Sequence, residues 1–267
     1  MTYAVSDIAW PVEDDTEAHE MLAEEGIRLL EIEPSRFWPD LLQVSEAEAR
    51  ARTESIAKQA LLVGSVQALL SAKPELQVFG ENGGKACQDY LKAACRIAGW
   101  MGAGVVIFGS PANRLRGTLS RPEAVKRAVE FFHAIGDAAL ENNTVLCLKP
   151  SPAAYGADFL LTTQEAAQVI YAVDSPGVRL NLDVGELIVN ESDVYRTVTD
   201  YLPLAGNLHA SEPMLAPFNA KTEAHRQAAA ALKASDYEVL ISLEMKPPAN
   251  GLPAVHQALL EMRRVYG

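Results

Sequence analysis

Cysteine is scarce in this sequence, and its pattern excludes one class of protein. Three cysteines occur among 267 residues, Cys87, Cys95 and Cys147, and none of them belongs to a C-x-x-C pair. An odd number of cysteines at these spacings gives no basis for a disulfide framework. We therefore expect each thiol to act as a small apolar filler of the protein interior.

Long apolar runs and positive charge are also scarce. No stretch of 18 apolar residues occurs, so we expect no membrane-spanning helix. The first residues, MTYAVSDIAWPVEDD, lack the basic start and the apolar centre of a signal peptide, and we expect a cytoplasmic protein. Lys and Arg total 23 against 35 Asp and Glu, a formal net charge of −12. This balance argues against a nucleic-acid partner and against a basic membrane-binding face.

The rest of the composition is that of a folded globular chain. Hydrophobic residues make up 49% and charged residues 22% of the sequence, which is enough to bury a core without disulfides. No linker rich in Pro, Gly or Ser divides the chain, so we expect one domain over residues 1–267. The phosphate-binding pattern G-x-x-x-x-G-K-[ST] is absent, and we expect no nucleotide cofactor.

Apolar, β-prone runs alternate with helical patterns along the whole chain. The expected strands are 3–10, 27–33, 61–67, 104–108, 144–149, 178–183, 206–210 and 237–244. The expected helices are 16–25, 45–60, 85–98, 121–141, 163–173, 192–201, 221–234 and 252–265. The run 61–67 is ambiguous on its own, because it also fits a longer preceding helix. Ser45 and Glu48 form a capping box, and Thr163 is the expected cap of its helix.

This alternation predicts a parallel sheet with crossover helices. Eight βα units in about 250 residues match an eight-stranded parallel (β/α)8 TIM barrel. The rival is an open doubly wound sheet, which usually has a glycine-rich phosphate loop after its first strand. Here the first strand is followed by AWPVEDD, which contains no glycine. The α/β class is therefore expected in its barrel form.

Polar residues stand at the ends of the expected strands. In such a barrel these ends converge on one face, where the chemistry takes place. The strand-end residues are Ser6 or Asp7, Glu31, Gln67, the turn 109–110, Lys149, Asp183, His209 and Glu244. Among them, Asp183, His209 and Glu244 are a ligand set for a divalent metal such as Mn, Zn or Mg.

Lys149 interrupts this ligand set. A protonated amine is no metal ligand, and it repels a cation nearby. Two unit charges about 4 Å apart interact by about 4 kcal/mol at an effective dielectric constant of about 20, which equals roughly three decades of metal affinity. The same charge attracts Asp183 and Glu244. We therefore expect Lys149 to take the electrostatic place of a metal and the site to hold metal weakly or not at all.

Several stretches together resemble the sugar phosphate isomerase/epimerase family, the xylose-isomerase-like TIM barrels. They are FGSPANR (108–114), KPSPAAYGADFL (149–160), LNLDVGE (180–186), HASEP (209–213) and SLEM (242–245). LLEIEPSRF (29–37) and VGSVQALLSAKPELQVFG (63–80) look like the second and third strands of the family with their loops, which favours a strand at 61–67. The resemblance implies an eight-stranded barrel that isomerises or epimerises a small sugar-like substrate, with a homodimer as the family-based expectation.

The chain departs from the family pattern at two points. The family has Glu in an E-P-N pattern at the fifth strand, where this chain has Lys149, and that Glu is both a metal ligand and a catalytic base. Many members have D-T-G-H at the sixth strand, where this chain has Glu186 in place of the His. We expect Glu244 to be the general base, with Asp183 beside it, and Lys149 or protonated His209 to stabilise the enediolate. A Schiff base on Lys149 is an alternative.

Four further residues are expected to contact the substrate: Glu31, Glu186, Trp10 and Tyr155. Two other functions stay open beside the enzyme. One is a non-catalytic or diverged barrel that binds a sugar-like ligand without metal, which the Lys149 substitution favours. The other is phosphodiester cleavage, because a DNA-repair endonuclease shares this fold. That reaction needs several metals with many His and acidic ligands, whereas the chain has five histidines and a net charge of −12.

Overall fold

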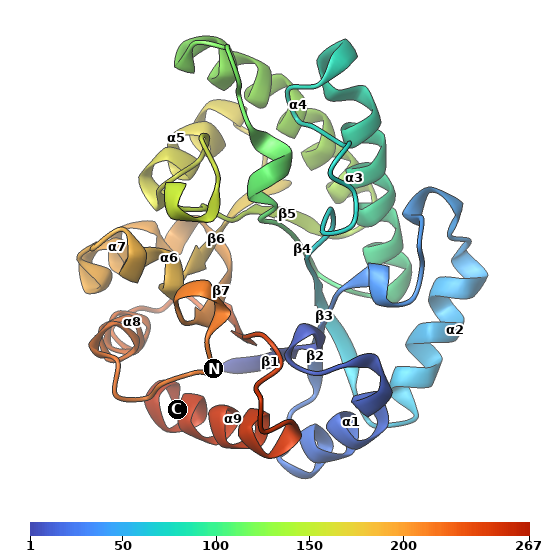
Figure 1. Ribbon diagram of the computed structural model, residues 1–267, viewed down its shortest axis with the longest axis vertical. Coiled ribbons are helices and arrows are strands. Elements are labelled where there is room, and N and C mark those ends of the chain that lie inside the picture. Colours follow the sequence, from blue (N-terminus) through green and yellow to red (C-terminus); the bar gives the residue numbers. More distant parts are fainter.

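The computed structural model describes residues 1–267 as a closed barrel of eight parallel strands. The strands pair in chain order, and β8 pairs with β1 to close the barrel (Figure 1). The strands are β1 (Thr2–Ser6), β2 (Leu29–Ile32), β3 (Leu62–Val66), β4 (Val105–Phe108), β5 (Val145–Leu148), β6 (Val178–Asp183), β7 (Ala205–Ser211) and β8 (Leu240–Glu244). The eight-stranded α/β barrel predicted from the sequence is confirmed.

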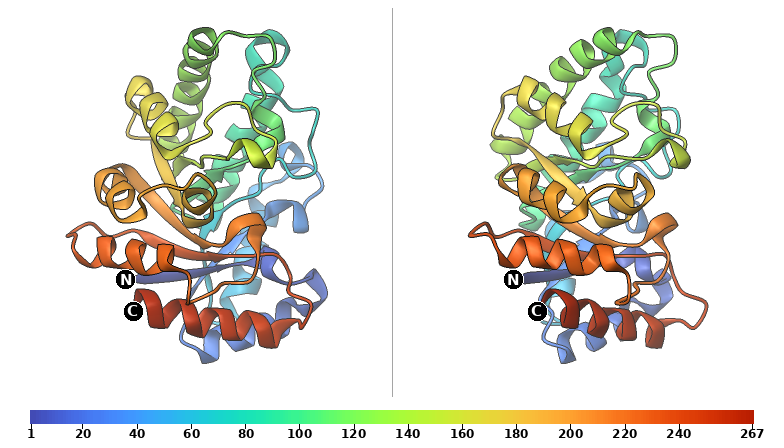
Figure 2. Two further views of the ribbon diagram at one scale, coloured as in Figure 1. Left: turned by 60° about the vertical axis from the view of Figure 1, so that its left-hand side comes forward. Right: turned by 90° about the vertical axis from the view of Figure 1, so that its left-hand side faces the viewer.

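Helices connect the strands and cover the outside of the barrel (Figure 2). They are α1 (Asp15–Glu24), α2 (Glu46–Ala57), α3 (Glu81–Met101), α4 (Arg121–Glu141), α5 (Thr163–Val173), α6 (Val184–Val189), α7 (Val194–Tyr201), α8 (Glu223–Lys233) and α9 (Leu252–Tyr266). Their inward faces form one large apolar core with the strands. None of these helices combines the length and apolar character needed to cross a bilayer.

Several elements differ from those expected. The first strand ends at Ser6 rather than at residue 10, because residues Asp7–Ala9 turn into a short 3-10 helix. The last strand begins at Leu240, since residues 237–239 are exposed or half-buried and lie outside the sheet. The sixth strand is followed by two helices, α6 and α7, whereas the sequence pattern indicated one. The ambiguous run 61–67 is the strand β3.

Helix caps agree with the sequence at one helix and differ at another. Ser45 and Glu48 form the expected capping box at the start of α2. At α5 the cap is Thr162, whose side chain accepts a hydrogen bond from the amide of Glu165, and not Thr163. Thr163 is the first residue inside the helix, and its hydroxyl donates to Glu186 instead. The expectation at Thr163 was therefore wrong by one residue, because both threonines offer the same capping oxygen.

Buried polar side chains from β6, β7 and β8 form a hydrogen-bonded layer within the sheet. Asn181 on β6 accepts a hydrogen bond from Asn207 on β7, with 2.8 Å between Oδ1 and Nδ2, and Ser242 on β8 donates to Asn207. All three side chains are fully buried. These bonds satisfy polar groups that would otherwise destabilise the core, and they place a polar layer next to His209 in the sheet.

Candidate active site

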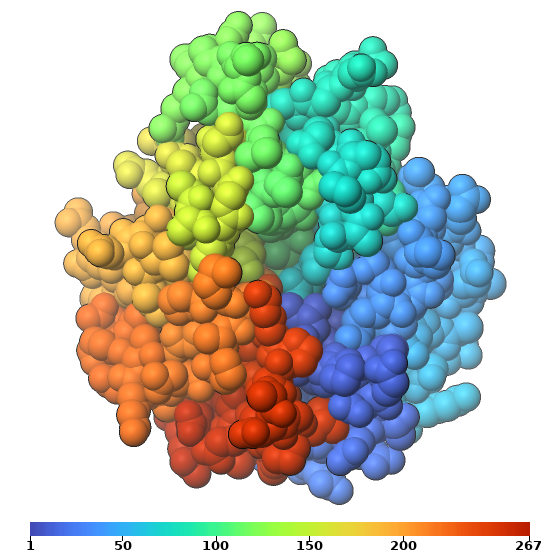
Figure 3. Space-filling view, viewed as in Figure 1, coloured from blue at the N-terminus to red at the C-terminus, as the bar shows by residue number.

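A cavity of about 480 Å³ opens at the ends of the strands. Its walls come from the ends of strands and the segments that follow β1, β3, β4, β5, β6, β7 and β8. The space-filling view shows the molecular surface hollowed near its centre, where segments from all parts of the chain meet (Figure 3). Lys149, Asp183 and Glu244 line this cavity, each at or just after the end of its strand.

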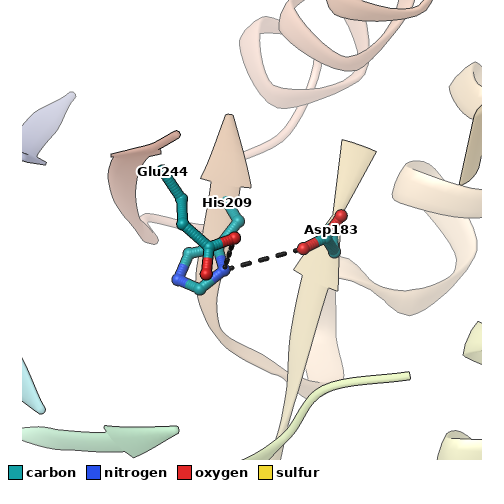
Figure 4. A group of neighbouring side chains, drawn as sticks. All are labelled: Asp183, His209 and Glu244. Atoms are coloured by element: carbon teal, nitrogen blue, oxygen red, sulfur yellow. Dashed lines mark ion pairs between the residues drawn. The ribbon is translucent and has the colours of Figure 1, made fainter. Parts of the chain in front are cut away.

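The amine of Lys149 lies among three polar side chains. Its Nζ is 2.7 Å from Oδ2 of Asp183, 2.5 Å from Oε2 of Glu244 and 3.0 Å from Nδ1 of His209. The side chains of Asp183, His209 and Glu244 converge from β6, β7 and β8, in that order (Figure 4). An ammonium group has three N–H donors; Asp183 and Glu244 accept two of them, whereas Nδ1 of His209 accepts a hydrogen bond only in the neutral imidazole.

A glycine beside the lysine makes room for its side chain. A Cβ atom at Gly109 would lie 3.3 Å from Cδ and 3.7 Å from Cβ of Lys149. The aliphatic part of Lys149 therefore lies against the backbone at the end of β4. This contact directs the amine toward Asp183 and Glu244 rather than toward solvent, and only 16% of the lysine side chain is exposed.

The charges of the cluster stabilise one another. Burial lowers the pKa of Lys149, but Asp183 and Glu244 raise it more strongly, and the net pKa lies above its ordinary value. Burial raises the pKa of Asp183, but Lys149 and His209 hold it far below the usual range. The pKa of Glu244 is also lowered, against the effect of burial, by His209 and Lys149. Lys149 is therefore an ammonium group between two carboxylates at neutral pH.

His209 connects this cluster to the barrel interior. Its Nε2 lies 3.1 Å from Oε1 of Glu31, and Glu31 Oε2 accepts a hydrogen bond of 2.7 Å from the hydroxyl of Ser65. Burial lowers the pKa of His209, but Glu244 and Glu31 raise it well above its ordinary value. Glu31 is fully buried behind His209 and does not line the cavity. The expected contact between Glu31 and a substrate therefore has no support, because the imidazole lies between them.

Asp183 has its second oxygen fixed by the protein. Oδ1 accepts hydrogen bonds of 2.8 Å from the hydroxyl of Ser211 and 2.8 Å from the amide of Glu186. The second bond caps the N-terminus of α6, so the short helix and the carboxylate orient each other.

Glu186 lines the cavity, as expected for a residue that contacts the substrate. It accepts hydrogen bonds from Thr163, with 2.9 Å between Oε2 and Oγ1, and from Asn190, with 2.7 Å between Oε1 and Nδ2. Burial raises its pKa to about 7, against the effect of these hydrogen bonds. Both of its oxygens are engaged, so the carboxyl is held in one orientation at the cavity wall.

The two aromatic residues expected at the site lie in different places. Tyr155 lines the cavity, and its hydroxyl accepts a hydrogen bond of 3.0 Å from the amide of Met214. Trp10 is buried and does not line the cavity. Its indole donates to Asp15, and its ring packs edge-on against His19. The expected substrate contact from Trp10 is therefore replaced by a contact within the core.

One carboxylate of the cavity wall belongs to a residue for which no site role was expected from the sequence. Glu212, directly after β7, has Oε1 within 2.8 Å of the hydroxyl of Thr222 and 3.3 Å of Nε2 of His225. His225 in turn lies 2.8 Å from the hydroxyl of Tyr266, and both are fully buried. Oε2 of Glu212 has no partner within the protein. The signal was the place of Glu212 in HASEP, one residue after the strand end.

Asp183, His209 and Glu244 are of the types that hold a divalent metal. One ligand atom of each lies within 4.8 Å of the others, and all three residues are buried. Three such ligands of mixed oxygen and nitrogen type suit metals such as Mn and Zn. The Nζ atom of Lys149, however, lies within hydrogen-bond distance of all three.

Comparisons with known proteins place this chain in a family. Among solved structures, it is similar to D-psicose 3-epimerase from Clostridium cellulolyticum H10, at 16% identity over 100% of this chain and 99% of that one, with a TM-score of 0.80. It is similar to 3-keto-D-glucoside 4-epimerase from E. coli, at 15% identity over 99% of both chains, with a TM-score of 0.81. A third, L-ribulose 3-epimerase, has 15% identity and a TM-score of 0.76, over 100% of this chain and 91% of that one.

These identities show a shared fold. A comparison with curated protein sequences finds no match. Residues 6–262 match the sequence pattern of the family described as xylose isomerase-like TIM barrel. Because this match covers almost the whole barrel, the chain belongs to the xylose isomerase-like TIM barrel family.

Proposed function

We propose that this protein is an isomerase or epimerase of a small polyhydroxy carbonyl compound, with the ammonium group of Lys149 in the place of a divalent metal. The main support is the position of Lys149 Nζ, which lies 2.7 Å from Asp183, 2.5 Å from Glu244 and 3.0 Å from His209. The named activities of the similar structures, which include 3-epimerases, support the reaction class.

A metal does not fit beside this amine. A metal bound by Asp183, His209 and Glu244 needs the region that Nζ occupies, and the ammonium charge would repel it. Lys149 already pairs with both carboxylates and, with His209, holds the pKa of Asp183 low. We therefore derive no catalytic step through a metal.

The reaction class requires removal of a proton from the carbon next to a carbonyl. The C–H electron pair then forms a carbon–carbon double bond, and the carbonyl oxygen becomes an enediolate oxygen that needs positive charge. Glu244 is the base in this scheme, because Lys149 holds its Oε2 while its Oε1 has no partner within the protein. Glu244 then returns the proton to the neighbouring carbon in an isomerisation, whereas an epimerisation requires a second acid to protonate the same carbon from the opposite face.

Lys149 stabilises the enediolate in this scheme. Asp183 and Glu244 accept two of its N–H donors, so the third is left for the substrate oxygen, and the amine keeps its charge throughout. Glu186 and Tyr155 line the cavity and contact the hydroxyl groups of the substrate. A Schiff base is disfavoured, since it needs a neutral amine and the raised pKa of Lys149 keeps the amine protonated.

The test combines isotope exchange with metal analysis. Wild-type protein in D2O is incubated with a panel of ketoses, and deuterium incorporation next to the carbonyl is measured by NMR. We expect exchange by the wild type, a loss of at least about a hundredfold in Glu244→Gln, and unchanged exchange after dialysis against a chelator. Tightly held Mn, Zn or Co near one per chain in the wild type would overturn the role of Lys149.

A charge-reversed variant makes the metal test sharper. Lys149→Glu adds a fourth ligand to Asp183, His209 and Glu244, and we expect it to bind one divalent ion per chain in elemental analysis. Lys246→Glu is the matched control, since Lys246 lines the same cavity but is exposed and makes no ion pair. A gain of metal in both variants would show a nonspecific effect of added negative charge.

A second function has one specific observation in its favour. Because Lys149 pairs with both buried carboxylates of the site, the cluster would equally stabilise the fold of a barrel that only binds a sugar-like ligand. Ligand binding without any deuterium exchange would favour this function over the enzyme.

A further inference from the structure

The cavity has a polar floor and an apolar rim. The floor is formed by the buried groups Lys149, Asp183 and Glu244. The rim is formed by half-buried or exposed apolar side chains from the segments after β3, β4, β5 and β7, namely Pro74, Pro111, Ala112, Tyr155, Met214 and Leu215. We call these six residues the apolar rim. Apolar surface gathered around a cavity indicates a binding surface.

Two residues of the apolar rim have an unfavourable backbone conformation. Met214 and Leu215 both have φ of 58°, in the left-handed region that residues other than glycine, Asn and Asp rarely adopt. Two consecutive large residues in this region indicate strain, which proteins retain mainly at functional sites. The conformation places both side chains at the cavity.

Hydrogen bonds from three segments hold this strained turn. The amide of Met214 donates to the hydroxyl of Tyr155 at 3.0 Å, and the amide of Lys246 donates to the carbonyl of Leu215 at 2.9 Å. The amide of Leu215 donates to the carbonyl of Glu212 at 3.0 Å. The loops after β5, β7 and β8 thus fix the two apolar side chains in place, and the turn is a built part of the cavity.

Several polar residues in the cavity wall use side-chain hydrogen-bond donors for contacts within the protein. The amide nitrogen of Asn113 donates to the carbonyls of Lys73 and Leu76, both at 2.7 Å. The amide nitrogen of Gln67 donates to Ser6, and the hydroxyl of Ser71 donates to Glu33. A sugar with hydroxyl groups on every carbon would leave some of them facing apolar side chains, which is unfavourable.

We propose that the substrate carries an apolar substituent, an alkyl or aryl group, which binds against the apolar rim while its polyhydroxy carbonyl end lies on the polar floor. The polyhydroxy half of this substrate rests on the proposed function, whereas the apolar half rests on Met214, Leu215 and their neighbours. A cavity of about 480 Å³ is large enough for both halves, because drug-sized ligands occupy cavities of roughly 300–1,000 Å³.

The test compares two ligands that differ only in the apolar group. Methyl and phenyl β-D-glucoside are titrated into the wild-type protein by calorimetry, as unreactive analogues of a substituted sugar. We expect the phenyl glucoside to bind at least roughly tenfold more tightly, since its ring buries more apolar area. Equal affinities, or no binding of either compound, would overturn the proposal.

Variants assign the preference to the apolar rim. Met214→Ser is expected to reduce the ratio of the two dissociation constants toward one. Met214→Gly removes the same side chain but accepts the positive φ without strain, so loss of the preference in this variant cannot come from unfolding. Leu140→Ser is the control, because Leu140 is 43% exposed on α4 and does not line the cavity; its ratio must stay at the wild-type value.

The outcomes separate this inference from the proposed function. A preserved phenyl preference with no deuterium exchange into any ketose would refute the enzyme and keep the apolar site. Exchange without a phenyl preference would keep the enzyme and refute the apolar site.

Discussion

At the scale of single residues, Lys149 determines the state of two buried carboxylates. Asp183 and Glu244 are 4% and 3% exposed, and each makes its shortest charged contact with the lysine amine. Isolated charges are strongly unfavourable in such surroundings unless they are paired. The ammonium group is therefore required for the fold around the site as well as for the proposed reaction.

We expect Lys149→Met to lower the free energy of unfolding at pH 7 by about 3–5 kcal/mol, the usual effect of removing one partner from a buried ion pair. The pH dependence should also change. In the wild type the lowered pKa values of Asp183 and Glu244 add stability above pH about 4, which is lost on further acidification. In the variant only His209 still opposes the effect of burial on these carboxyls, so both pKa values should rise, and the difference in stability between the wild type and the variant should narrow as the pH falls from 7 to 5.

Urea unfolding at pH 5, 6 and 7 measures this effect. Lys246→Met serves as the control, since Lys246 is an exposed cavity residue without an ion pair. If the free energies of unfolding of the wild type and Lys149→Met change with pH in the same way, the central position of the amine is contradicted.

The residues at strand ends were predictable because a parallel barrel brings these ends together. Lys149, Asp183, His209 and Glu244 do converge, and their roles stay a prediction. The position of the Trp10 side chain could not be predicted in the same way, because the chain that follows a strand end takes no regular direction. Trp10 follows the 3-10 helix Asp7–Ala9 and is buried in the core, and no sequence pattern predicted this helix.

At the scale of elements, the strands were predictable from their apolar runs and the helices from their period. The helix α6 could not be predicted, since its six residues VGELIV are too short to show a helical period. The start of the last strand was set too early, at residue 237, because Tyr237 and Val239 have high β propensity although they lie outside the sheet.

Close contact between α4 and the segment before β6 depends on two glycines. A Cβ at Gly177 would lie 2.2 Å from the carbonyl oxygen of Gly136. We expect Gly177→Ala to lower the free energy of unfolding by roughly 1–3 kcal/mol, as overpacking commonly does. Thermal unfolding followed by circular dichroism gives the measurement. Gly104→Ala is the matched control, because nothing lies within 4 Å of its Cβ; an equal loss in both variants would refute the packing argument.

At the scale of the whole molecule, the closed barrel leaves its three thiols inaccessible. Cys87, Cys95 and Cys147 are at most 1% exposed, and burial raises the pKa of each to about 12. Their expected role as apolar fillers agrees with this burial. Ellman's reagent should therefore react with fewer than about one thiol per native chain and with all three in denaturant. Rapid reaction in the native state would show that the barrel opens locally.

The family was recognisable from HASEP and SLEM, because these short motifs contain the strand ends that face the site. The apolar rim was not recognisable, because it depends on the backbone conformation of Met214 and Leu215. Nothing in the residue types of this segment indicates a left-handed turn, which in most proteins occurs at glycine or asparagine.

Lys149 is part of the polypeptide, so the positive charge at the centre of the site does not depend on the supply of a metal ion. An ion taken from solution is held according to its concentration, and a stronger competitor in the Irving–Williams order can displace it. The amine of Lys149 is covalently part of every chain, so it neither dissociates nor is displaced by another ion. Under the proposed function, the protein would therefore keep its activity when trace metals are depleted.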